Sequence, residues 1–391
     1  MRDWTGRHAS PRLVEEPGDG LLLANRFDVA LWSTDLRRLS CQSAVRKAMN
    51  IGEIARRSGV SRSTVSYALS GKRPVSEATR RRIRDVIDEL GYRPNAAARA
   101  LKEGRTRTLG LVIPPASTRL THMQLDFVAS VVEAAARADL DVLLSPSGGD
   151  HDSSFERLLA GGRVDGVILM EIRLEDSRVS RLQEARLPFV GIGHTSSADD
   201  MCWIDVDYAG LISQSVHHLA DLGHTRIALI NRSPELVAAG YGPGHRARDG
   251  FIAAAAQRGL HTVDYLCGDD ARDGYKCLQR LLAEHPEVTA ITTINEAALP
   301  GIQRALDDAG LTIPRDFSIT GVAARPWAEE FRPPLTAADV PAEEIGSQAV
   351  KLLIERIAAP NTASRHILLS PPISLRASTA PAPIRGSGHS E

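Results

Sequence analysis

The feature that most constrains the fold is a long alternation of short apolar segments with amphipathic ones from Thr108 onward. The amphipathic segments have the spacing of one helix face, as at Val128, Val131, Val132 and Ala135. Strands alternating with helices predict parallel sheets covered by helices on both faces. Residues 108–379 exceed what one such sheet needs, so we expect two lobes. The predicted strands are Leu109–Ile113, Asp141–Leu144, Gly166–Met170, Phe189–Ile192, Ile227–Ile230, Ala290–Thr293 and Ser318–Val322.

A different pattern, typical of three short helices, occupies residues 49–93. Asn50 is a suitable N-cap, Ser61 and Ser76 can cap the second and third helices, and Gly91 can end the third. The first two helices and their turn have the spacing of a helix-turn-helix. In that motif the second helix enters the DNA major groove and its first side chains reach base edges. The apolar positions are Ile51, Ile54 and Ala55, then Val65, Ala68 and Leu69, then Ile83, Val86, Ile87 and Leu90.

Charge is distributed unevenly along the chain. Residues 49–107 hold 14 Lys and Arg against 6 Asp and Glu, a net charge of +8, whereas residues 108–391 hold 25 against 36, a net charge of −11. A small basic segment attached to an acidic body indicates a polyanionic partner for the small segment alone, although a solvated charged face has the same composition.

Three segments flank or connect these regions. Residues 94–107 contain a short alanine-rich stretch that is too short to be a stable helix unless something braces it. Residues 1–48 are either a disordered extension or precede the true start at Met49, and the sequence leaves both alternatives open. The Pro-, Ser- and Gly-rich residues 380–391 are expected to be disordered.

The remaining features favour a cytoplasmic protein. The four cysteines have no metal-ligand spacing, and neither a signal peptide nor a membrane-spanning apolar run is found. We expect no catalytic residue, cofactor or metal. The glycines of Gly240-Tyr-Gly-Pro-Gly244 do not form a dinucleotide fingerprint, and Pro243 is expected to disturb the opening of a helix there.

The helical segment resembles the lactose-repressor (LacI) family of bacterial regulators. The matching stretches are Ile51-Gly-Glu-Ile-Ala-Arg-Arg-Ser-Gly-Val-Ser-Arg-Ser-Thr-Val-Ser-Tyr-Ala-Leu-Ser-Gly71, Val75-Ser-Glu-Ala-Thr-Arg80 and Leu90-Gly-Tyr-Arg-Pro-Asn-Ala-Ala-Ala-Arg-Ala-Leu101. The resemblance implies a helix-turn-helix domain at 49–93, a hinge helix and linker at 94–107, and a two-lobed effector and dimerisation domain of the periplasmic-binding fold at 108–379.

The resemblance also implies DNA-binding roles. Arg62, Ser63 and Tyr67 match base-reading positions, and Asn50, Ser61, Thr64 and Ser66 match positions near phosphates. Leu101 matches the leucine that wedges into the minor groove, although its other interpretation is an ordinary core leucine. The hinge positions Asn95, Arg99 and Lys102 complete the predicted DNA-binding set.

The effector half departs from the family pattern. Ala247 stands where the family has an arginine, and Ala323-Ala324 stand where it has an aspartate pair that often holds sugar hydroxyls. A standard monosaccharide is therefore a less favoured effector. The candidate effector-binding residues are Ser117, His194, Arg246, Glu296, Arg325 and Trp327, of which Trp327 alternatively packs in the core or at an interface.

These observations predict a transcriptional regulator, by analogy a repressor, that binds a near-palindromic operator as a homodimer under the control of a small-molecule effector between the lobes. The C-terminal segment lacks a leucine heptad, so we expect no tetramer built on a coiled coil. The alternative is a solute-binding protein of the periplasmic-binding fold. The basic helix-turn-helix and the lack of a signal peptide argue against this alternative. A third class, a nucleotide-dependent enzyme, is not supported, because no nucleotide-binding motif is found.

Overall fold

The computed structural model describes residues 51–70, 73–92, 100, 104–114, 120–147, 152–197, 199 and 201–383. The chain forms two compact units, Met1–Pro94 and Asn95–Glu391. The predictions for residues 1–48 and for Asn50 lie outside the described residues, as do those for Asn95, Arg99, Leu101, Lys102 and Ser117.

The first unit is a bundle of three helices, α2 (Ile51–Ser58), α3 (Arg62–Ser70) and α4 (Glu77–Leu90). Their apolar positions meet in a small core of Ile54, Ala55, Val65, Ile83 and Val86. The predicted caps Ser61, Ser76 and Gly91 are confirmed. The Ser76 side chain accepts a hydrogen bond from the Thr79 amide, and Gly91 ends α4 in the left-handed conformation at φ 58°.

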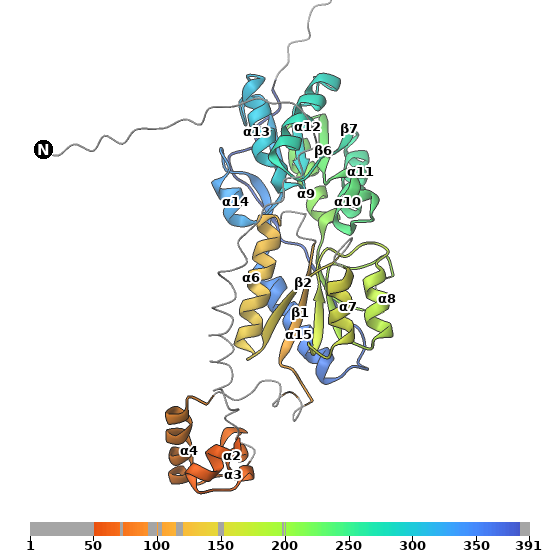
Figure 1. Ribbon diagram of the computed structural model, residues 1–391. Helices are drawn as coiled ribbons and strands as arrows, with labels where there is room; N and C mark the ends of the chain where they lie inside the picture. The colour runs from red at the N-terminus through yellow and green to blue at the C-terminus, as the bar shows by residue number, and fades with distance from the viewer. Residues whose placement is uncertain are drawn as a thin grey trace, which may run out of the picture. The chain divides into compact units, whose positions relative to one another are not determined.

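The second unit has two lobes, each built on a six-stranded sheet (Figure 1). In the N-lobe the strand order is β11-β5-β4-β3-β1-β2, and every pairing is parallel. Helices α6 and α15 pack together on this lobe, closely enough that a side chain at Gly346 of α15 would collide with Ser130 of α6. The N-lobe elements are β1 (Thr108–Ile113), α6 (His122–Arg137), β2 (Asp141–Pro146), α7 (Asp152–Ala160), β3 (Gly166–Leu169), α8 (Ser177–Glu184), β4 (Phe189–Ile192), β5 (Cys202–Val206), α15 (Ala342–Ala358) and β11 (His366–Leu369).

The C-lobe repeats this design with the strand order β12-β10-β9-β8-β6-β7. Its pairings are parallel except for the antiparallel edge strand β12. Helices α9 and α11 approach so closely that a side chain at Gly250 would collide with the backbone of Ala209. The C-lobe elements are α9 (Tyr208–Asp221), β6 (Arg226–Asn231), α10 (Pro234–Ala238), α11 (Gly242–Arg258), β7 (His261–Leu266), α12 (Ala271–Glu284), β8 (Ala290–Thr293), the 3-10 helix η4 (Glu296–Ala298), α13 (Leu299–Asp308), β9 (Ser318–Ala323), α14 (Arg325–Glu330), β10 (Thr336–Asp339) and β12 (Ile373–Ser374).

Three connections join the lobes within residues 201–383: β5 to α9, β10 to α15, and β11 to β12. Hydrogen bonds tie these connections to one another. The Asp207 amide donates to the Leu369 carbonyl at 2.9 Å, and the Ser374 hydroxyl donates to Asp339 at 2.8 Å. Three bundled connections of this kind allow the lobes to rotate as rigid bodies about one hinge.

All seven predicted strands are present, and the fold class is confirmed. Five strands were missed: β5, β7, β10, β11 and β12. Several of these carry polar residues, as in His261–Leu266, and therefore lack a plain apolar run. The predicted onset of disorder at Ala380 is too early, because its carbonyl oxygen accepts from His224 at 3.1 Å and the Ala382 amide donates to Leu222 at 2.8 Å. Within the described ranges, no helix is long and apolar enough to cross a membrane.

Candidate operator-reading helix and effector cleft

The start of α3 is organised by Ser61. Its hydroxyl oxygen accepts from the Thr64 amide at 3.1 Å and lies 2.7 Å from the Ser63 hydroxyl and 2.8 Å from the Thr64 hydroxyl. Val65 is fully buried beneath this turn, which fixes the helix on the small core. Arg62 and Ser63 consequently face solvent at the first turn of α3, where a recognition helix presents its base-reading side chains.

The other predicted DNA contacts on α3 lie close to this turn. Ser61 is exposed, whereas Thr64, Ser66 and Tyr67 are half-buried. The Arg73 guanidinium lies 5.2 Å from the centre of the Tyr67 ring, so one face of that ring is covered by a cation. The structure therefore brings together Ser61, Arg62, Ser63, Thr64, Ser66 and Tyr67 on one short segment.

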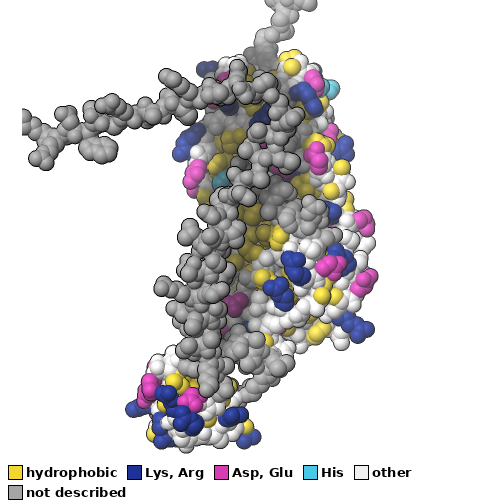
Figure 2. All heavy atoms as spheres, viewed as in Figure 1, with side chains coloured by type: hydrophobic (Ala, Val, Ile, Leu, Met, Phe, Trp, Pro, Cys, Tyr) yellow, Lys and Arg dark blue, Asp and Glu magenta, His cyan; other side chains and the backbone are white. Residues whose placement is uncertain are grey.

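Ion pairs brace the helices behind this segment. Arg57 of α2 pairs with Glu53 at 3.1 Å and with Glu89 of α4 at 2.9 Å. Hydrogen bonds from Arg56 and Arg57 lower the pKa of Glu53 to about 2. Arg side chains, in dark blue, also lie on the visible face of this unit, beside carboxylates in magenta (Figure 2). Such a surface attracts a phosphate backbone independently of sequence.

The second candidate site lies between the two lobes, at the carboxyl ends of the parallel strands. Ligands of open parallel sheets bind at this end of the strands. Here a cavity of about 30 Å³ has walls from both lobes. Its described lining residues are Met123, Gln124, Phe127, Met170, Glu171, Ile172, Ile192, Gly193, Asp205, Val206, Tyr208, Tyr241 and Pro243.

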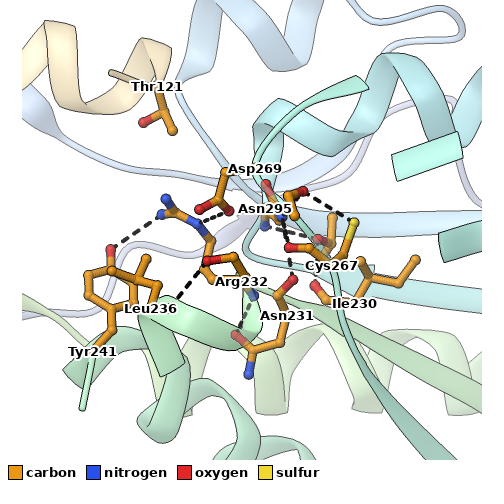
Figure 3. Close-up of polar contacts among 12 residues, drawn as sticks. Thr121, Ile230, Asn231, Arg232, Leu236, Tyr241, Cys267, Asp269 and Asn295 are labelled. Atoms are coloured by element: carbon orange, nitrogen blue, oxygen red, sulfur yellow. Dashed lines mark hydrogen bonds and ion pairs between the residues drawn. The ribbon is translucent and has the colours of Figure 1, made fainter. Parts of the chain in front are cut away.

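Arg232, directly after β6, is the central cation on the C-lobe side (Figure 3). It is 2% exposed, and its Nε donates to Asp269 at 2.7 Å while its Nη1 lies 3.5 Å from the Tyr241 hydroxyl. Burial alone would lower the pKa of Arg232, but Tyr241, Asp269 and Glu171 together hold it above its usual value. Its Nη2 has no hydrogen-bond partner among the described residues.

Asn295, after β8, forms the neighbouring part of the C-lobe edge. Its Nδ2 donates to the Cys267 carbonyl at 3.0 Å and the Gly268 carbonyl at 3.2 Å, which fixes the end of β7 (Figure 3). Its Oδ1 is buried without a partner among the described residues. A free donor on Arg232 and a free acceptor on Asn295 can both serve a polar ligand.

Two predicted effector residues, His194 and Arg246, lie together across the cleft. The His194 Nδ1 lies 2.9 Å from Asp205, and Arg246 of the C-lobe donates to the His194 carbonyl at 2.7 Å and lies 3.4 Å from Asp205. The His194 ring also stacks on Trp203 at 4.3 Å. This cluster therefore links the lobes through Asp205, a cavity residue that the sequence did not single out.

Two further predicted residues also link the lobes. The Glu296 carboxylate accepts from the Met123 amide of the N-lobe at 2.8 Å and from the Ala324 amide at 3.1 Å. Trp327 stacks on His122 of the N-lobe at 4.3 Å, and its Nε1 is buried without a partner among the described residues. Arg325 does not join this set, since it is exposed and lies near Glu329 and Asp339 at 3.4 and 3.5 Å.

Besides Asp205, the sequence interpretation missed Glu171, Arg232, Tyr241 and Asp269 in the cleft. The signal that could have found three of them is position, because Glu171, Arg232 and Asp269 each follow a strand. Tyr241 belongs to the glycine-rich segment, whose interpretation needs correction. Pro243 does not disturb a helix but sits in the first turn of α11, where a missing amide is tolerated.

A helix-turn-helix unit and a two-lobed ligand-binding fold in one chain define the class of ligand-responsive DNA-binding regulators. Residues 50–95 match the model of the bacterial regulatory proteins of the lacI family, and residues 216–379 match that of the periplasmic binding protein-like domain. The HTH-type transcriptional regulator AglR of Rhizobium meliloti (strain 1021) is 34% identical over 351 residues, which cover 86% of this chain and 96% of AglR. The chain belongs to the LacI family and is a transcriptional regulator.

Two solved structures share this architecture. The transcriptional regulator CelR in complex with cellobiose is 27% identical, covers 84% of this chain and 99% of CelR, and has a TM-score of 0.64. The lac repressor dimer bound to operator and the anti-inducer ONPF is 22% identical, covers 85% of this chain and 100% of that one, and has a TM-score of 0.76. At 22% identity, the similarity to the lac repressor supports the fold alone.

Proposed function

We propose that the chain is a repressor that binds a near-palindromic operator as a homodimer and is controlled by a small molecule bound between its lobes. The observation that carries the DNA-binding half is the Ser61-organised start of α3, which exposes Arg62 and Ser63. The hinge segment is proposed to be residues 94–107, which connect residues 49–93 to residues 108–379 in the sequence. Its Asn95, Arg99, Leu101 and Lys102 are proposed to contact DNA. We propose that the protein acts on its operator in the cytoplasm.

The effector half of the proposal rests on the contacts that close the cleft. Glu296 with the Met123 amide, Arg246 with the His194 carbonyl, and Trp327 with His122 all cross from one lobe to the other. Ligand pockets usually measure about 300–1,000 Å³, so the cavity of about 30 Å³ cannot hold a whole effector. Binding therefore requires the lobes to rearrange, and an effector that prefers one arrangement shifts the population toward it.

The effector is proposed to differ from a standard monosaccharide. CelR is described in complex with cellobiose. In this chain Ala247 is fully buried, and Ala323 and Ala324 at the end of β9 are 1% and 3% exposed, so these positions supply no arginine or carboxylate. His194, Arg246, Glu296, Trp327 and, from the sequence alone, Ser117 and Arg325 remain the proposed effector residues.

Exposed apolar side chains support the homodimer. Leu125 and Val132 of α6 are 49% and 42% exposed, and Leu144 of the edge strand β2 is 47% exposed. On the C-lobe, Ile252 of α11 and Leu266 of the edge strand β7 are 47% and 37% exposed. Edge strands and apolar helix faces left open to water are typical of surfaces covered by a partner, and the lac repressor structure is described as a dimer.

The test is selection of random double-stranded DNA by the full chain, followed by mass measurement of the complex on the winning site. We expect a two-fold symmetric sequence occupied by two chains, and weaker binding by Leu101→Ala. An asymmetric site occupied by one chain would refute the homodimeric reader. Absence of any enriched sequence, with and without candidate effectors, would instead favour a solute-binding protein.

A further inference from the structure

The cavity at the base of the cleft is acidic and aromatic. It is lined by two carboxylates, Glu171 and Asp205, and by the rings of Phe127, Tyr208 and Tyr241. None of its described lining residues is a lysine or an arginine. We propose that the effector carries a positively charged amino group that binds in this cavity beside Glu171. This inference rests on the proposed function, since it names the chemical class of the molecule that the cleft senses.

Within the described part of the chain, no lysine or arginine forms an ion pair with the Glu171 carboxylate. Among the described residues, the neutral side-chain amide of Gln124 donates a hydrogen bond to the Glu171 Oε1. Two arginines close by are already paired, Arg178 with Asp176 at 2.6 Å and Arg232 with Asp269 at 2.7 Å. Burial raises the pKa of Glu171, and this effect outweighs the opposing influence of Arg232, Arg178 and Arg173. A bound ammonium group would relieve the cost of this desolvated carboxylate.

Asp205 contributes to the same acidic wall but is already engaged. Its carboxylate lies 2.9 Å from the His194 Nδ1 and 3.4 Å from Arg246, and it accepts from the Val206 amide at 2.7 Å. Asp205 therefore helps to hold the lobes together through His194 and Arg246. Glu171 is left as the carboxylate that can accept from a ligand.

The backbone at Glu171 is held in an unusual conformation. Its φ is 50°, in the left-handed region that non-glycine residues rarely adopt. Arg178 holds this turn, because its Nη2 donates to the Glu171 carbonyl at 2.9 Å and to the Met170 carbonyl at 3.2 Å. Strained residues kept in place by their surroundings are frequent at ligand clamps, and here the strain directs Glu171 to the cavity wall.

Size and aromatic character fit a headgroup. A volume of about 30 Å³ holds an ammonium group but not a whole ligand. The faces of Phe127, Tyr208 and Tyr241 can attract a cation through their negative quadrupoles. Burial keeps the Tyr208 pKa well above its usual value, so its hydroxyl stays neutral. Arg232 Nη2 and Asn295 Oδ1, which have no hydrogen-bond partner among the described residues, are suited to bind the uncharged polar part of the effector. The proposed effector class is therefore a small organic amine.

The test compares amines with their hydroxyl counterparts on the full chain. The pairs are methylammonium and methanol, putrescine and 1,4-butanediol, and glucosamine and glucose, each assayed by thermal shift and calorimetry. Glu171→Gln keeps the side-chain shape but removes the charge, whereas Glu175→Gln removes the same charge from an exposed position outside the cavity. We expect at least one amine to bind, with affinity reduced on the order of tenfold in Glu171→Gln and unchanged in Glu175→Gln.

Equal binding of the hydroxyl counterpart, amine binding that survives Glu171→Gln, or no binding by any of the three amines would overturn the proposal. Operator affinity distinguishes this failure from that of the proposed function. If a neutral compound changes operator affinity while no amine binds, the regulator stands and the cationic class is wrong. If an amine binds through Glu171 without changing operator affinity, the cation site stands and the regulatory role of the cleft fails.

Discussion

The three-helix unit and the two-lobed unit differ in how much core supports each site. In the described residues, the small unit buries five apolar side chains, Ile54, Ala55, Val65, Ile83 and Val86. Each lobe of the large unit buries apolar side chains on both faces of a six-stranded sheet. Small domains with few buried side chains have little free energy of unfolding to spare. One substitution should therefore act very differently in the two units.

The sites also differ in how the chain assembles them. The proposed DNA-reading residues from Ser61 to Tyr67 are nearly consecutive, and all but Ser61 lie on α3. The cleft takes Glu171, Asp205, Arg232 and Asp269 from the ends of four strands in two sheets. A local site depends on whether one helix forms, whereas a distributed site depends on how two lobes are placed. The predictions below test this difference.

The largest expected effect is that of Ile54→Ala in the small unit. Ile54 is fully buried, and removing its side chain should cost about 4 kcal/mol, comparable with the whole stability of such a unit. We expect operator binding to be lost and the helical signal of this unit to disappear, while the main thermal transition of the two-lobed unit is unchanged. Circular dichroism, calorimetry and DNA anisotropy measure these effects.

The matched control is Ile354→Ala on α15, where the isoleucine is 37% exposed and is not among the side chains proposed for the homodimer surface. It should change the free energy of unfolding by less than about 1 kcal/mol. Equal loss of operator binding in both variants would show that the small unit does not fold independently of the large one, and the comparison of the two units would be wrong.

The next largest effect is expected for Asp269→Ala in the cleft. Arg232 would remain buried without its ion-pair partner, which should lower the free energy of unfolding of the two-lobed unit by about 3 kcal/mol. Asp264→Ala is the control, because Asp264 pairs with Arg248 at the surface and should cost well under 1 kcal/mol. Denaturant unfolding measures both. Similar values for the two variants would show that Arg232 does not depend on Asp269.

The difference between a local site and a site assembled from distant residues also decides how much of each could be predicted from the sequence. The caps Ser61, Ser76 and Gly91 and the apolar face of α4 could be assigned from spacing, because helix geometry relates neighbours in sequence to neighbours in space. His194 and Arg246 were named as candidates, but their meeting through Asp205 depends on contacts between two lobes. No local pattern encodes such a meeting.

The cleft shows the same limit in what was missed. Arg232 follows a strand that was predicted. Nothing near it in the sequence distinguishes it from a surface arginine until Asp269, which follows the neighbouring strand β7, is placed beside it. Arg325, a predicted effector-binding residue, is exposed at the start of α14, and the sequence could not show which face of this helix is turned outward. Charged residues at strand ends need the sheet order before their partners can be named.

The smallest of these effects, and the one that bears most directly on function, is expected for Arg62→Ala. Arg62 is exposed at the first turn of α3, so its loss should leave the stability of the unit within about 0.5 kcal/mol. Binding to the selected operator should weaken by about 2 kcal/mol, and discrimination should be lost at the base pair that Arg62 reads.

The control is Arg82→Ala on α4, which removes the same charge from another exposed position. It should weaken binding to all sequences equally, and by less than Arg62→Ala weakens binding to the selected operator. Competition assays with single-base operator variants separate these outcomes. If Arg62→Ala weakens binding to every variant equally, Arg62 contacts phosphate and sequence reading must come from Ser63 or Tyr67. The local site would then be as hard to assign from sequence as the distributed one.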